Sequence, residues 1–297
     1  RVIWAIVAHR PALTPPAIRD RQNASMQELQ RYNRYLARYV RRLTGNEGIP
    51  EEVRNRAAAD LAALHGKLTG GLGRDALLET ARKAETEIVE PLLKPLDAQA
   101  DKHVRACVRD VTIGVALSPY RSADLLIVLY KNLVTLRRII IVYNSRPTLR
   151  EQFRVFRDIL SVVATVNFLN LFGKMLDSLS GVPVLGRYAD NLAQGAGAGL
   201  MTSAAGHAAI DRCRAFRGWD KEEAKESLTG NLSGFLTDVK DIILKDVIPA
   251  LGKGLGGAAK RTVGGVGDKL KGAAKRLLGR GDEAEDAERQ PGEGPAT

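Results

Sequence analysis

A long uncharged segment rich in glycine and alanine, Asn191–Ile210, most constrains what this chain can fold into. No formal charge occurs between Asp190 and Asp211, and about 20 residues is the length that a bilayer requires of a helix. Glycine and alanine dominate where leucine, isoleucine and phenylalanine are expected in a lipid-facing span. The pattern therefore predicts a helix that is either buried in a helical core or placed in a membrane.

Small residues at four-residue intervals define one face of this helix. Gly195, Gly199 and Ser203 follow one another along the helix axis, because residues four apart share a face. Such a face carries almost no side chain, and small-xxx-small surfaces let a second helix approach closely. We expect the three residues to pack helices and not to hold a reaction.

Residues Asn23–Leu43 have the apolar periodicity of an amphipathic helix. The apolar face combines aliphatic side chains with tyrosines, at Met26, Leu29, Tyr32, Tyr35, Leu36, Tyr39, Val40 and Leu43. A basic flank comprises Arg31, Arg34, Arg38, Arg41 and Arg42. Arginines interleaved with tyrosines could bind anionic phospholipid headgroups or nucleic acid. The other interpretation is the solvated face of a helix that packs on a core.

The two ends of the chain differ in composition from its middle. In residues 1–22 the apolar run Val2–Ala8 is followed by charges and prolines, and we expect the end of a membrane helix and a proline-rich linker, a buried turn or strand being the alternative. Residues 252–280 are basic and rich in glycine, with Lys253, Lys260, Arg261, Lys269, Lys271, Lys275 and Arg276. We expect this segment to order on an anionic membrane surface. Residues 281–297 form an acidic tail that we expect to be disordered.

The helical apolar patterns of the remaining regions, residues 23–73 and 74–251, predict an all-α multi-helix bundle. After residue 73, helices are expected over residues 74–108, 123–143, 149–176, 191–210 and 228–251, with a short uncharged run at 111–117 and a linker at 218–225. Pro91 and Pro95 are expected to kink or divide the first of these helices. Charges inside residues 123–143 are costly in hydrocarbon, so a plain membrane span is unfavourable there.

The charge balance limits the partners. The formal net charge is +11 and aromatic residues make up 5% of the chain. A basic protein favours phosphate-bearing partners, either nucleic acid or an anionic membrane. Single-stranded nucleic acid is bound through stacking aromatic residues, so anionic membrane lipid is the preferred partner and nucleic acid is disfavoured. The two cysteines give no disulfide framework and suit a reducing compartment.

Motifs that would carry chemistry fail on context or spacing. Gly252, Gly254 and Gly257 satisfy GxGxxG, but Pro249 and a helix precede them where a dinucleotide site needs a strand. The phosphate loop GxxxxGK[ST] is absent. His103 and Cys107 are one helical turn apart, but His207 and Cys213 are six residues apart, a poor spacing for one helix face, so a zinc site is disfavoured. We therefore expect a non-enzymatic protein without cofactor or metal.

Several pieces of the chain, in order, resemble the YcjF-like family of uncharacterised bacterial inner-membrane proteins. They are LDAQA at 96–100, ALSP at 116–119, Asp124 with Asn132-Leu133 and Arg138, AQGAGAGLMTSAAG at 193–206, and Cys213-Arg214. The resemblance covers about half the chain and implies an α-helical protein of the cytoplasmic membrane. It also implies association with a P-loop GTPase, because this domain tends to be encoded beside one or fused to one. It supplies no catalytic residues.

Two functional hypotheses follow. The first is a membrane-associated scaffold or adaptor on the cytoplasmic face of the bacterial inner membrane, in a stress- or envelope-related process, with a P-loop GTPase as partner and a homo-oligomer as one candidate assembly. The second is a conditionally inserting, pore-forming or membrane-remodelling protein that stores semi-apolar helices in a soluble bundle. This second hypothesis is suggested because the helices are too apolar for an ordinary protein surface and too charged or too short to span a membrane permanently.

Overall fold

The computed structural model describes residues 13–16, 18, 22–69, 73–116, 121–144, 148–166 and 185–249. All regular structure in these residues is helical, and the expected all-α multi-helix bundle is confirmed. The elements are α2 (Met26–Leu43), α3 (Glu51–Thr69), α4 (Arg74–Lys83), η1 (Ala84–Val89), α5 (Glu90–Ala116), α6 (Arg121–Asn144), α7 (Leu149–Val163), α9 (Leu185–Arg214), α10 (Lys221–Gly230), α11 (Leu232–Ile242) and η2 (Ile243–Val247).

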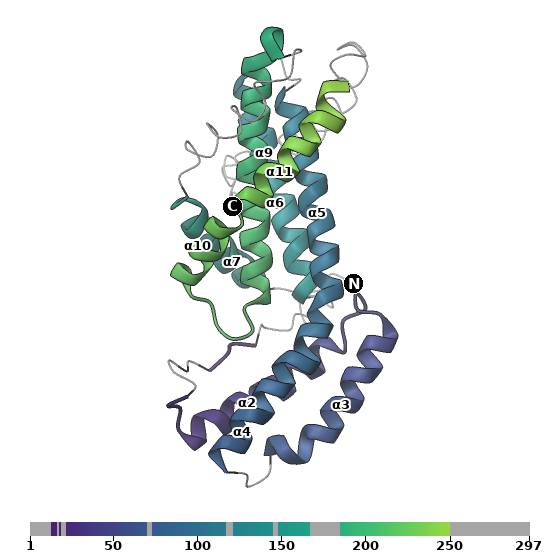
Figure 1. The fold of residues 1–297 in the computed structure, drawn as a ribbon, viewed down its shortest axis with the longest axis vertical. Helices are drawn as coiled ribbons and strands as arrows, with labels where there is room; N and C mark the ends of the chain where they lie inside the picture. The colour runs from purple at the N-terminus through teal and green to yellow at the C-terminus, as the bar shows by residue number, and fades with distance from the viewer. Residues whose placement is uncertain are drawn as a thin grey trace, which may run out of the picture.

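The bundle is elongated, and α5 connects its two ends (Figure 1). Helices α2 and α3 pack beside α4 and η1, which lead directly into α5, whereas α6, α9 and α11 pack along α5 itself. One hydrophobic core runs through both groups, from Tyr32 and Leu36 of α2 through Leu96 of α5 to Ala204 of α9 and Val239 of α11. The regions 23–73 and 74–251 thus share buried contacts.

Side-chain caps explain where three helices begin. Ser25 and Glu28 form a reciprocal capping box at α2, and Thr148 with Glu151 forms another at α7. Asp220 accepts hydrogen bonds from the backbone of the first turn of α10. This cap corrects the expected linker at 218–225, because the helix already starts at Lys221.

The predicted division at the prolines takes a different form. The chain does not break at Pro91 or Pro95, because α5 runs through both prolines and continues to Ala116. Residues 111–116 of the uncharged run therefore belong to α5 and do not form a separate element. The π-helical turn η1 precedes Pro91, and the N–H of Glu90 bonds to the carbonyl of Glu85. The hydrogen-bond spacing thus changes from four residues to five directly before Pro91, which has no N–H to donate.

The glycine- and alanine-rich segment lies inside the bundle as part of α9. A Cβ atom on Gly195 would lie 2.6 Å from the carbonyl oxygen of Thr112 and 2.9 Å from the Cβ atom of Ala116, both in α5. Gly199 faces the Thr112 side chain in the same way, and Ser203 on this face is buried. The structure places all three small residues where α9 approaches α5.

Several expectations fall on residues that the structure does not describe. The apolar run Val2–Ala8, the basic segment 252–280 with its eight lysines and arginines, and the acidic tail 281–297 lie outside the described residues. The expected helix 149–176 is described only to residue 166, and α7 ends at Val163. Within the described part, none of the helices combines the length and apolar character that crossing a bilayer requires.

Candidate functional site

Charged side chains gather where α9 ends, and each arginine there joins a different element. Arg212 Nε lies 2.8 Å from Asp158 Oδ2 of α7. Arg214 bonds to Glu90 at 2.6 Å and lies 3.3 Å from Asp97, both in α5. In the turn that follows, Arg217 bonds to the buried Glu85 of η1 at 2.9 Å. We call Glu85, Glu90, Asp97, Asp158, Arg212, Arg214 and Arg217 the α9-end cluster.

The tyrosines of α2 and α6 complete this cluster. Tyr32 donates its hydroxyl to Glu85, Tyr35 donates to the carbonyl of Phe216 at 2.9 Å, and Tyr143 donates to Asp97 at 2.5 Å. The rings of Tyr32, Tyr35, Tyr39 and Phe216 are stacked in succession, with centroids 5.9–6.0 Å apart. The α2 tyrosines therefore face the protein interior, so they do not accompany the arginines on the surface as the headgroup-binding interpretation required.

Burial shifts the pKa values of the acids in and beside the cluster. Burial raises the pKa of Asp97, although the Tyr143 hydroxyl and Arg214 act in the opposite direction. Burial also raises the pKa of Asp211, near the end of α9, whereas the hydrogen bond from Ser227 and the nearby charge of Arg214 lower it. Arg214 thus acts against the effect of burial on the pKa values of both carboxyls.

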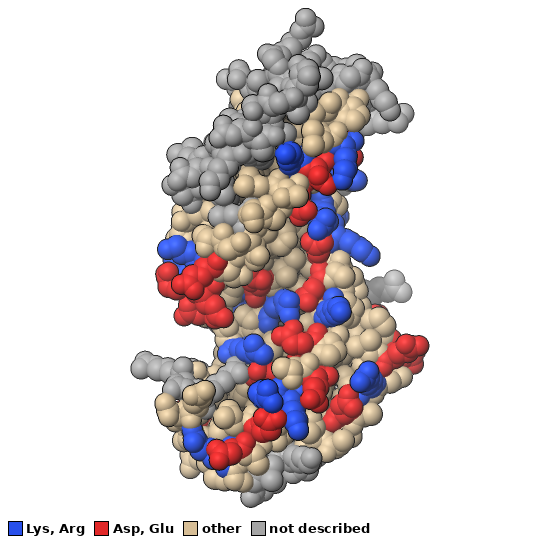
Figure 2. Space-filling view, in the orientation of Figure 1, with Lys and Arg blue, Asp and Glu red and all other residues tan. Residues whose placement is uncertain are grey.

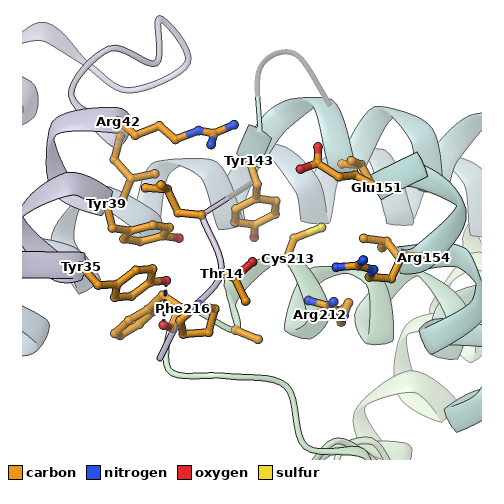
Figure 3. Close-up of a pocket in the computed structure, with 16 residues that line it drawn as sticks. Thr14, Tyr35, Tyr39, Arg42, Tyr143, Glu151, Arg154, Arg212, Cys213 and Phe216 are labelled. Atoms are coloured by element: carbon orange, nitrogen blue, oxygen red, sulfur yellow. Dashed lines mark hydrogen bonds between the residues drawn. The ribbon is translucent and has the colours of Figure 1, made fainter. Parts of the chain in front are cut away.

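A pocket of about 190 Å³ opens beside the cluster (Figure 3). Tyr35, Tyr39 and Phe216 form one wall, while Arg154 and Arg212 extend from the opposite side. The further labelled lining residues are Thr14, Arg42, Tyr143, Glu151 and Cys213. The charged lining thus comprises three arginines and one glutamate, and guanidinium groups are suited to binding an anionic group.

The pocket does not offer an ionised nucleophile in its described lining. Burial raises the pKa of the Cys213 thiol to about 12. Burial also raises the pKa values of Tyr39 and Tyr143 above those of ordinary phenols. At neutral pH the thiol and both phenols are therefore protonated, and thiolate chemistry needs the ionised form. The arrangement is suited to binding and to joining helices.

The arginines predicted on α2 separate into two positions. Arg31, Arg34, Arg38 and Arg41 are exposed, whereas Arg42 is half-buried and lines the pocket. At 100° per residue the four exposed arginines fall within an arc of roughly 80°, on the side of α2 opposite its buried residues. We call these four residues the α2 arginine stripe.

The histidines and cysteines do not form a metal site in the described residues. Cys107 is buried with Val111 and Val115. His207 lies on Phe235, and its Nδ1 is 2.8 Å from the carbonyl oxygen of Ser203. Across the described ranges, no group of three or more histidine, cysteine, aspartate and glutamate residues is arranged to hold an ion.

Sequence reasoning missed the α9-end cluster. Its acids and arginines are 54, 124 and 132 residues apart along the chain, so no local pattern joins them. The available signal was the close succession of Arg212, Arg214 and Arg217 after an uncharged helix. On the face in Figure 2, acidic and basic side chains likewise lie next to one another, so this face does not present a field of one sign.

Fold and cluster together define an all-helical bundle protein in which a charged cluster joins the end of α9 to η1, α5 and α7. Residues 80–237, just over half of the chain, match the family described as Domain of unknown function (DUF697), and the chain belongs to this family. A UPF0283 membrane protein of Rhizobium johnstonii is 32% identical over 150 residues, which is 46% of this chain and 42% of the relative. One from Brucella ovis is 30% identical over 171 residues, which is 57% of this chain and 44% of the relative.

These matches span less than half of each relative's length. No solved structure matches the chain. The similarity agrees with the expected resemblance to an uncharacterised family whose relatives are named membrane proteins.

Proposed function

We propose that this chain is a non-enzymatic scaffold or adaptor of the YcjF-like type, attached to the cytoplasmic face of a bacterial inner membrane. The α2 arginine stripe carries the proposal. Arg34 and Arg38 donate only to backbone carbonyls one turn earlier, and none of the four arginines forms an ion pair with a described carboxylate. Glu28, the acid closest in sequence to Arg31, is held in the capping box with Ser25. The stripe is therefore available to lipid phosphates.

The matched relatives support this assignment, because they are named membrane proteins. A basic residue near an anionic bilayer contributes about 1 kcal/mol to binding. Four arginines on one helix face can thus hold a peripheral protein on such a bilayer, and the basic segment 252–280 would add to this attraction. The α9-end cluster would keep the bundle rigid while it is bound.

The charge-reversal variant Arg34→Glu/Arg38→Glu is expected to bind vesicles that contain phosphatidylglycerol at least about 30-fold more weakly than the unchanged protein. Flotation of the 297-residue chain with these vesicles measures the difference. The matched control is Arg56→Glu/Arg82→Glu, which makes the same charge change at exposed arginines that already pair with Asp60 and Glu79. The control is expected to lose much less affinity.

Successive washes of the floated protein test the peripheral attachment. Release by high salt supports the proposal, since salt screens exposed charges. Resistance to both a salt wash and an alkaline wash would contradict it and indicate inserted helices. Equal losses in the two double variants would show that net charge alone, and not the α2 arginine stripe, decides binding.

Nucleotide chemistry is assigned in this proposal to a partner P-loop GTPase. The chain itself lacks the GxxxxGK[ST] loop, and the YcjF-like resemblance implies association with such a GTPase. Affinity purification of the crosslinked protein from cells that naturally produce it is expected to enrich a P-loop GTPase over an unrelated peripheral membrane protein. If no GTPase is enriched, this part of the proposal is wrong.

A second candidate function is conditional insertion into the membrane. The buried Thr112 hydroxyl, which faces Gly199, makes no hydrogen bond, and such a group costs the folded state free energy. Opening α9 away from α5 would relieve that cost. If α9 also left α6, the hydrogen bond of Asn132 in α6 to Thr202 in α9 would break. Dye release from anionic vesicles distinguishes the two functions, because a scaffold binds without leakage.

A further inference from the structure

The apolar side of helix α7 is wider than its buried part, and one edge of it is exposed. Ile159 and Val162 are buried against the bundle. Leu149, Phe153 and Leu160 are 80%, 74% and 64% exposed, which makes them the three most exposed large apolar side chains among the described residues. At 100° per residue they fall within an arc of about 40°. We call these three residues the α7 outer face.

The α7 outer face is not explained by packing within the described bundle. A helix on the surface of a soluble protein normally buries its apolar residues and exposes polar ones. Here a leucine, a phenylalanine and a second leucine stand in line along three turns of one helix. Contiguous exposed apolar surface of this kind marks an interaction site.

Basic residues border this face on one side. Arg150, Arg154 and Arg157 are exposed, and their wheel positions follow directly after those of the apolar residues. Arg157 pairs with Asp158 at 3.0 Å, and Asp158 is also bound by Arg212. No ion pair within the described residues involves Arg150 or Arg154. The border is therefore positively charged.

An apolar strip bordered by arginines matches the chemistry of an anionic bilayer surface. Leucine and phenylalanine enter the boundary between headgroups and acyl chains, while arginines extend to the phosphates. The occupant must therefore offer both apolar surface and negative charge side by side over the length of α7. Anionic phospholipid provides both, whereas a zwitterionic lipid such as phosphatidylcholine provides the apolar surface without net negative charge.

We propose that the α7 outer face inserts into the headgroup boundary of an anionic bilayer, with Arg150 and Arg154 binding lipid phosphates. This inference rests on the proposed membrane attachment and specifies where the protein enters the lipid. The α2 arginine stripe supplies attraction from a distance, whereas the α7 outer face supplies apolar contact. Removing the apolar contact weakens binding even where the attraction remains.

The variant Phe153→Glu is expected to partition about tenfold more weakly into vesicles of phosphatidylglycerol and phosphatidylcholine. Two variants are matched to it in flotation of the full chain. Leu133→Glu makes a comparable change at a residue of α6 that is 43% exposed, and it is expected to change partitioning by less than about twofold. Phe153→Leu keeps the apolar contact and is expected to bind like the unchanged protein. Because Phe153 is largely exposed, circular dichroism should show the same helix content in all variants.

Each outcome decides a distinct point. If the unchanged chain fails to float with anionic vesicles, both the proposed function and this inference are wrong. If it floats and Phe153→Glu floats equally well, only the inference is wrong. Equal losses in Phe153→Glu and Leu133→Glu, or equal binding to pure phosphatidylcholine, also overturn it. Light scattering without vesicles completes the test: a dimer that Phe153→Glu converts to a monomer would assign the α7 outer face to a second copy of the chain.

Discussion

Replacing Gly195 with alanine is expected to destabilise the protein by about 2–3 kcal/mol. The new Cβ atom would lie 2.6 Å from the carbonyl oxygen of Thr112 and 2.9 Å from the Cβ atom of Ala116. The first of these is a backbone atom of α5, so it cannot move aside like the end of a flexible side chain. Helices α5 and α9 must separate to relieve the overlap, and close packing is then lost along their contact. Urea unfolding followed by circular dichroism measures the change.

Gly114→Ala is the matched control, because Gly114 is also a helical glycine but has no atom within 4 Å of its added Cβ. There the substitution removes only the flexibility that glycine gives the unfolded chain, and it is expected to stabilise the protein by about 0.5–1 kcal/mol. The two variants should therefore shift stability in opposite directions. A stabilised Gly195→Ala variant would show that the contact between α5 and α9 tolerates separation.

The small-residue face shows how far sequence reasoning can reach. Four-residue spacing identified Gly195, Gly199 and Ser203 as one bare face, because helical periodicity is a local property. The same spacing could not choose between a protein and a lipid environment. That choice depends on Thr112 and Ala116, which are some eighty residues earlier in the sequence and meet α9 only after folding.

Helix α2 likewise shows that local sequence patterns do not reveal distant partners. Its apolar periodicity predicted the buried positions Leu29, Leu36 and Val40 correctly. The tyrosine hydroxyls could be interpreted either as surface groups or as buried donors, because a tyrosine has an apolar ring and a polar end. The acceptors of Tyr32 and Tyr35 are Glu85 and the carbonyl of Phe216, and no local pattern reveals such distant partners.

The α7 outer face shows a further limit. On a helical wheel the apolar residues of 149–163 form one continuous arc of about 180°, which indicates a single buried face. The structure shows that only part of this arc packs on the bundle and that Leu149, Phe153 and Leu160 at one edge of it are exposed.

Replacing Arg214 with methionine is expected to destabilise the protein by about 2 kcal/mol at neutral pH. The variant retains the apolar stem but removes the cation that lies 2.6 Å from Glu90 and 3.3 Å from Asp97. Glu90 and Asp211 each oppose the ionisation of Asp97, so three carboxylates would then lie close together without this cation. The half-exposed position of Arg214 keeps the cost below that of a fully buried pair.

The loss should depend on pH in a defined direction. Burial raises the folded-state pKa values of Asp97 and Asp211, and Arg214 offsets part of that rise. Without Arg214 these folded-state pKa values increase further, while the unfolded-state values do not change. A carboxyl whose folded-state pKa exceeds its unfolded-state pKa destabilises the protein above the folded-state pKa, and this effect disappears once both states are protonated. The deficit of Arg214→Met is therefore largest at neutral pH and shrinks as the pH falls towards the ordinary aspartate range.

Two comparisons separate this effect from the loss of any surface arginine. Arg105→Met removes an exposed arginine that lies 2.8 Å from Asp101, one helical turn away, and should cost less than about 1 kcal/mol with little pH dependence. Adding Asp97→Asn to Arg214→Met should restore part of the lost stability, because it removes one of the stranded charges while its amide oxygen can still accept the Tyr143 hydroxyl. Equal losses in the two single variants, or a double variant less stable than Arg214→Met, would show that Arg214 does not organise these carboxylates.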